Sequence, residues 1–170
     1  MRCLTVLLLC LLPCAAATAA PVTMIEAKDA LASAGGEALN LAYDEGSPVI
    51  TGEMEEVPFE ARLSDCEGAY LACTRVALTA CLPAQSLSRI EALEFANDWN
   101  MASRLSFAFA RDDWFGQSAC LKYTESLLGE AAFGADDIFL WRLELEDFRL
   151  AVEDSAAGLL ASADLDTETP

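Results

Sequence analysis

The sequence predicts an α+β fold, in which one antiparallel β-sheet is covered by helices. Three segments place apolar residues at helical spacing, and shorter segments between them alternate apolar with polar residues. The expected order is a helix, two or three strands, a helix, two strands and a helix. No linker rich in Pro, Gly or Ser divides residues 21–158, so we expect a single domain.

The first twenty residues, MRCLTVLLLCLLPCAAATAA, predict a cleavable secretory signal peptide. Residues 4–12 form a short apolar run, and residues 15–20 offer small side chains to a signal peptidase. Neither Cys10 nor Cys14 follows a small residue, which argues against lipidation. No later apolar run approaches the roughly 18 residues of a membrane span. The mature chain is therefore expected to be periplasmic or secreted, without a membrane span.

The first half of the domain predicts one helix and then strands. Residues 22–36 predict a helix of about ten residues that ends at Gly35 and Gly36. The turn DEGSP follows a weakly alternating strand at residues 37–43, and residues 49–56 can continue a second strand. VPFEARL, at residues 57–63, alternates most clearly. Another strand is expected from about Tyr70 to Ala80.

The second half predicts two helices on either side of a hairpin. Ser86 or Ser88 can cap a helix that runs to about Asp98. Leu105, Phe107 and Phe109 form the core face of the next strand, RDDWFG is the turn, and QSACLKYTESL is the return strand.

The last helix is expected to be long and strongly apolar. Asp136 or Asp137 can cap it. One stripe of large apolar residues defines its core face, and a set of leucines makes the apolar surface wide. The stripe is Ile138, Trp141, Leu145, Phe148 and Val152, and the leucines are Leu140, Leu143 and Leu150. Residues 159–170 are expected to be an acidic, disordered tail.

The charge balance limits the partners that the protein can bind. The chain has 10 basic and 28 acidic residues, a net charge of −18, and no histidine. Such a chain repels nucleic acid and anionic lipid, so neither is an expected partner. The charge can serve solubility alone, or it can attract a basic partner. The lack of histidine removes Ser-His-Asp and Cys-His catalysis and histidine metal ligands, and we expect no cofactor, metal or catalytic residue.

Four cysteines remain after the signal peptide, an even number that favours disulfides in an exported chain. Cys66 and Cys73 flank a short turn between two alternating segments and can face each other across a hairpin. Cys81 and Cys120 both lie off the apolar face of their strands, and could bridge on the outer side of the sheet if those strands are neighbours. A four-thiolate zinc site and a redox-active pair are the alternatives, but no Cys-x-x-Cys motif supports them.

The motif Asn97-Asp98-Trp99-Asn100 closes the second predicted helix. On a helical wheel Asn97 shares a face with Ile90, Leu93 and Met101, so we expect a hydrogen-bonded amide on the packed face. Trp99 lies nearly opposite and should cover a loop or the sheet edge, and Asn100 can terminate the helix. The alternative is a small polar site with an aromatic wall.

Several of these features resemble the YbjN-domain family, whose members are described as bacterial sensory transduction regulators. The residues that carry the resemblance are Asn97, Trp99, Asn100 and Arg104 before an aromatic strand, with Cys66 and Cys73 before the preceding strand. It spans roughly residues 22–152. The resemblance implies a fold like the type III secretion chaperones, ordered α-β-β-β-α-β-β-α, and a small acidic binding protein compatible with a homodimer. Cys81, Cys120 and the Ala-rich acidic end depart from the family pattern.

These observations lead to three functional hypotheses. The first is an exported non-enzymatic binding or regulatory module that acts through protein–protein contacts. The second is a periplasmic small-ligand sensor with a pocket near Trp99. The third is a hydrolase that uses Asp112 and Asp113 as paired carboxylates, although the turn RDDWFG explains these residues better.

Overall fold

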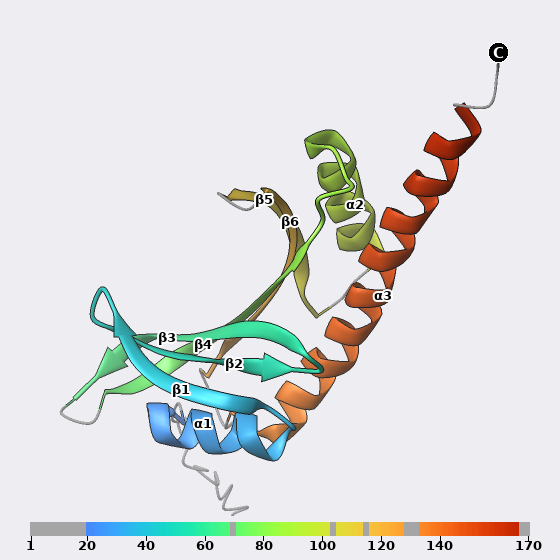
Figure 1. The fold of residues 1–170 in the computed structure, drawn as a ribbon. Helices are drawn as coiled ribbons and strands as arrows, with labels where there is room; N and C mark the ends of the chain where they lie inside the picture. The colour runs from blue at the N-terminus through green and yellow to red at the C-terminus, as the bar shows by residue number, and fades with distance from the viewer. Residues whose placement is uncertain (1–19, 69–70, 103–104, 114–115, 128–132, 167–170) are drawn as a thin grey trace, which may run out of the picture.

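The computed structural model describes residues 20–68, 71–102, 105–113, 116–127 and 133–166 (Figure 1). Its three helices and six strands confirm the α+β class. The elements are α1 (Met24–Ser33), β1 (Glu37–Asp44), β2 (Ser47–Met54), β3 (Val57–Glu67), β4 (Ala72–Pro83), α2 (Arg89–Ala102), β5 (Phe107–Asp113), β6 (Gly116–Ser126) and α3 (Ala135–Asp166). All neighbouring strands are antiparallel, in the order β1-β2-β3-β4-β6-β5.

Four strands precede α2, one more than the expected order contains. The additional break lies between β2 and β3, where Glu55 and Glu56 form a two-residue hairpin turn with φ of 50° and 64°. Such left-handed turns are usually formed by Asn and Gly, and two glutamates give no turn signal in the sequence. The β1–β2 turn at Glu45 and Gly46 has the usual glycine and was recognisable.

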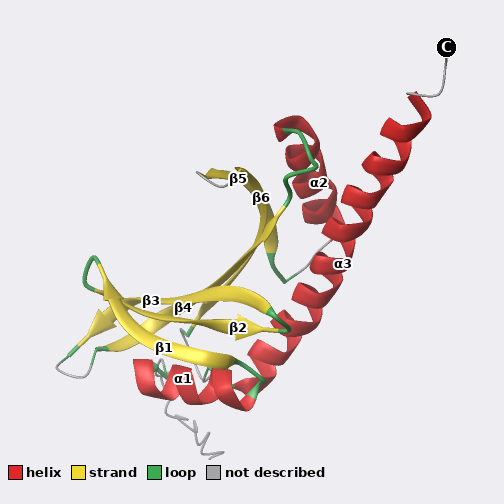
Figure 2. Ribbon diagram, in the orientation of Figure 1, coloured by secondary structure: helices red, strands yellow, loops and turns green. Residues whose placement is uncertain are grey.

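The inner face of the sheet forms the core. One inner row runs across four strands through Ile50, Ala61, Leu78 and Tyr123, all of which are buried. α1 and α3 lie on this side of the sheet, and α2 packs beside β5 and β6 (Figure 2). The outer face carries polar residues, including Arg62 in ion pairs with Asp44 and Glu60 at 2.6 and 3.1 Å.

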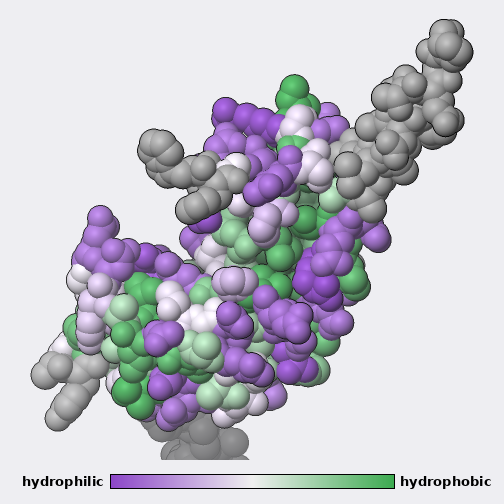
Figure 3. Space-filling model, viewed as in Figure 1, coloured by the Kyte–Doolittle hydropathy of each residue, from purple (hydrophilic) through white to green (hydrophobic). Residues whose placement is uncertain are grey.

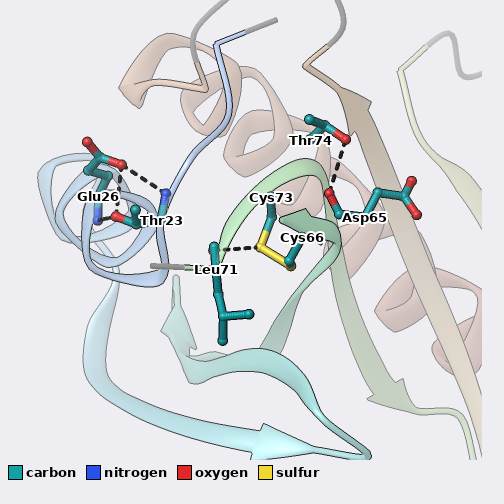
Figure 4. Close-up of a disulfide and its surroundings, with 7 residues drawn as sticks. All are labelled: Thr23, Glu26, Asp65, Cys66, Leu71, Cys73 and Thr74. Atoms are coloured by element: carbon teal, nitrogen blue, oxygen red, sulfur yellow. Dashed lines mark hydrogen bonds between the residues drawn. A yellow bond between two sulfur atoms is a disulfide. The ribbon is translucent and has the colours of Figure 1, made fainter. Parts of the chain in front are cut away.

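The predicted disulfide between Cys66 and Cys73 is present where β3 meets β4 (Figure 4). The backbone of Cys73 also exchanges two hydrogen bonds, of 2.8 and 2.9 Å, with Val22. α1 begins directly afterwards with a capping box. The Thr23 hydroxyl accepts a hydrogen bond from the backbone amide of Glu26, and the Glu26 carboxylate accepts one from the backbone amide of Thr23. The disulfide therefore lies where the N-terminal segment joins the sheet.

The second predicted disulfide, Cys81–Cys120, joins directly opposed residues of β4 and β6. It lies on the outer face, as strand parity indicates. The two bridges close sequence separations of 7 and 39 residues. On the chain-entropy model, the longer loop contributes roughly 4 kcal/mol and the shorter roughly 2 kcal/mol.

α3 crosses the core and extends beyond the sheet (Figure 1). Its buried stripe is the predicted one, and Trp141 packs edge-on against Phe59 of β3 with ring centroids 5.7 Å apart. The helix extends through Asp166, so the structure places part of the expected tail, residues 159–166, within the helix. Among the described helices, none is long and apolar enough to cross a membrane. The expected signal peptide, at residues 1–20, lies almost entirely outside the described residues.

Candidate docking groove between α2 and α3

α2 packs on the core through small and aromatic residues. Ser88 and Glu91 form a capping box at its start, with hydrogen bonds of 2.7 and 3.3 Å between backbone amides and side chains. Ala92 and Ala96 are buried on its inner face, and the aromatic side chains of Phe95 and Trp99 pack beside them. The alanines allow a close approach to the sheet, and the aromatic rings then reach α3.

The prediction that Asn97 lies on the packed face of the helix is wrong, because the residue is exposed. The face that it shares with Ile90, Leu93 and Met101 points outward, and Ile90 and Met101 are 68% and 80% exposed. Periodicity identified the helix but not its packed side, since both sides carry apolar residues. The buried side combines the small residues Ala92 and Ala96 with the rings of Phe95 and Trp99, and both rings pack against Phe148 of α3.

Asn100, three residues later, makes the amide contacts that were expected of Asn97. Its Nδ2 donates to the carbonyl of Ala108 at 2.9 Å, and its Oδ1 accepts from the Ala108 amide at 2.6 Å. Ala108 lies on β5, the edge strand of the sheet. The side chain thus satisfies two edge groups that would otherwise be available to another strand.

Trp99 connects α2 to α3. Its ring packs edge-on against Phe148, with centroids 5.0 Å apart. Its indole Nε1 is buried and has no hydrogen-bond partner among the described residues. The expectation that Trp99 covers a loop or the sheet edge is therefore replaced by a contact with the core of α3. Arg104, the last residue of the family motif, lies outside the described residues.

A groove of about 390 Å³ opens beside Trp99, and we call it the α2–α3 groove. Its other lining residues come from the end of α2, the segment after it, and α3: Ala102, Leu105, Leu140, Leu143, Glu144 and Asp147. The three leucines are exposed although they are large and apolar. Figure 3 shows hydrophobic side chains gathered where α2 approaches α3, next to hydrophilic side chains along α3. An exposed apolar surface with a polar rim is typical of a binding site.

The leucines of this groove were visible in the sequence, but their role was not. Leu140 and Leu143 were expected to widen the core face of the last helix. The structure exposes both, and buries the predicted stripe that includes Ile138, Trp141 and Leu145. It also exposes Leu105 and Phe107, which were expected on the core face of β5, and buries Ala108 in their place. A helical wheel could have indicated the groove, because it places these two leucines of α3 on the side opposite to the buried stripe.

Of the two carboxylates considered for catalysis, the structure describes the side chain of one. Asp112 is exposed, with its carboxylate 3.6 Å from Arg89, and the side chain of Asp113 lies outside the described residues. Burial and a 2.6 Å hydrogen bond to Glu125 raise the pKa of Tyr123 further above physiological pH. No cluster of three or more His, Cys, Asp or Glu suited to a metal occurs among the described residues.

No protein-family model matches the chain, and no curated protein matches it.

Proposed function

We propose that the mature chain is an exported, non-enzymatic binding module that acts through protein–protein contacts in the α2–α3 groove. The observation that carries the proposal is the exposure of Leu105, Leu140 and Leu143 around Trp99. Exposed apolar side chains that are clustered in a groove favour a macromolecular partner, because burying them would remove apolar area from water.

Export is supported by the two disulfides, which form and persist in oxidising compartments. The predicted signal peptide points the same way. Membership of the YbjN-domain family, with a fold like the type III secretion chaperones, is also a proposal. The succession of helices and strands supports it, although the sheet has one strand more than that pattern before α2.

Site-specific photocrosslinking in the native host tests the proposal. A photoreactive amino acid at Leu143, which is 43% exposed, should give a discrete crosslinked species. The matched control is the same amino acid at Leu93, which is 46% exposed but lies on the outward face of α2, away from the groove lining.

A specific band from Leu143 and none from Leu93 supports docking in the groove. Equal labelling at both positions would show only general stickiness of exposed leucines and would contradict the proposal. A complete lack of crosslinks from the correctly exported protein would contradict it as well.

A small-ligand sensor is the second candidate, supported by the volume of the groove and the indole of Trp99 in its wall. The volume lies at the low end of the range for ligand pockets. Titration of Trp99 fluorescence with periplasmic metabolites, with Trp99→Phe as the control, would reveal such a ligand. A flat response across the panel removes this candidate.

A further inference from the structure

α3 carries two apolar stripes on opposite sides. The inner one is buried in the core. The outer one consists of three leucines, Leu140, Leu143 and Leu150, with Asp147 between the last two. These four positions follow each other at spacings of three, four and three residues, and we call them the outer stripe. This is the spacing by which one helix packs along another, with side chains from two rows in alternation. The outer stripe, part of which lines the α2–α3 groove, therefore has the geometry to receive a helix.

Among the residues that the structure describes, the charged side chains in line with the outer stripe are negative. Asp136 and Asp154 lie in line with the outer stripe, and Asp147 lies within it; all three are exposed. Asp147 takes part in no ion pair among the described residues. The two arginines of this part of α3 are engaged on other sides of the helix: Arg142 with Glu55 at 3.4 Å, and Arg149 with Glu153 at 2.7 Å.

A second copy of the chain is a poor occupant of this face. Each copy has a net charge of −18, and two outer stripes in contact would bring their aspartates into the same interface. Like charges in a contact disfavour the pairing, whereas opposite charges steer association and fix its register. The charge pattern thus selects a basic partner over a homodimer.

Taking the docking function proposed above as its basis, we propose that the α2–α3 groove binds an amphipathic α-helix with an aliphatic face flanked by Lys or Arg. The aliphatic side chains pack on Trp99, Leu140 and Leu143. The basic side chains face Asp147 and the aspartates in line with it. A helix supplies both groups at the spacing of the outer stripe.

Binding of three synthetic peptides to the full mature chain tests this inference. Each has about 18 residues, roughly five helical turns. All share one leucine face, and the remaining positions are Lys, Gln or Glu. A fourth peptide scrambles the Leu/Lys sequence to remove the apolar face while keeping the composition. Fluorescence anisotropy of the labelled peptides gives the Kd values.

We expect the Leu/Lys peptide to bind most tightly, the Leu/Gln peptide more weakly, and the Leu/Glu peptide least. Leu143→Asp should weaken the Leu/Lys complex by about tenfold or more, as at an interface hot spot, while Leu93→Asp leaves it unchanged. Asp147→Asn should weaken it by roughly two- to fivefold, the effect of one partly exposed ion pair, and Asp98→Asn should have a smaller effect.

The outcomes separate the two proposals. If Leu/Gln and Leu/Lys bind equally and Leu143→Asp weakens both, the groove is a docking site but the basic partner is wrong. If the scrambled peptide binds as well as Leu/Lys, only general charge attraction is present, and the helix inference is overturned. If no peptide binds the unmodified protein more tightly than it binds the Leu143→Asp variant, the helix inference is overturned. The photocrosslinking experiment at Leu143 then tests the docking function separately.

Discussion

Replacing Asn100 with alanine should destabilise the protein, and replacing Asn97 should not. The Asn100→Ala change removes both hydrogen bonds to Ala108. Each is worth about 1 kcal/mol net, and solvent at this exposed position reduces the sum to between about 1 and 2 kcal/mol. Asn97→Ala is the matched control, since both residues lie on α2 and Asn97 is exposed without these contacts.

The comparison cancels the helix propensity of alanine, which favours both variants by roughly 0.5 kcal/mol. Urea unfolding of the oxidised protein should therefore show Asn100→Ala to be less stable than Asn97→Ala by about 1–2 kcal/mol. In thermal unfolding the difference should be roughly 3–6 °C for a domain of this size. Equal stabilities, or a larger loss for Asn97→Ala, would refute the assignment of the bridging amide to Asn100.

Three further predictions concern the fold. Replacing Cys81 and Cys120 together with alanine should cost up to roughly 4 kcal/mol in urea unfolding, and less if the reduced chain retains structure. Glu56→Gly should stabilise the protein by up to about 1 kcal/mol, because glycine adopts positive φ freely; unchanged or lower stability would contradict this. Hydrogen bonds from the backbone and hydroxyl of Thr23 lower the pKa of Glu26, so this capping contribution is present above the usual glutamate pKa and is lost as the pH falls through the lowered value. NMR titration should place that pKa below the usual value, and Thr23→Ala should raise it only part of the way back, because the backbone amide of residue 23 still donates to the carboxylate.

The sequence predicted those parts of the fold that have strong local signals. Strand parity placed Cys81 and Cys120 on the outer side of the sheet, and the turn between Cys66 and Cys73 indicated their pairing. The break between β2 and β3 was missed because Glu55 and Glu56 lack turn chemistry. A strand or turn was therefore predicted correctly where its residues carry a local signal, such as alternation or a turn-forming residue, and was missed where they carry none.

The candidate site was harder to predict, because both helices around it have two apolar sides. On α2 the long aliphatic residues, such as Ile90 and Met101, face outward, and the packed side contains Ala92 and Ala96 beside two aromatic rings. The choice between the two sides depends on how closely a helix can approach the sheet, which is a tertiary property. Trp99 was singled out from the sequence, but its contact with Phe148 required the fold.

The proposed function requires that a partner docks on the α2–α3 groove. Mapping amide and indole NMR shifts during titration with the Leu/Lys peptide tests it most directly. Docking in the groove predicts the largest changes at Leu140, Leu143, Asp147 and the indole of Trp99, with little change at Leu93. Changes confined to the outer face of the sheet or to the edge strand β1, or no saturable change at all, would contradict it.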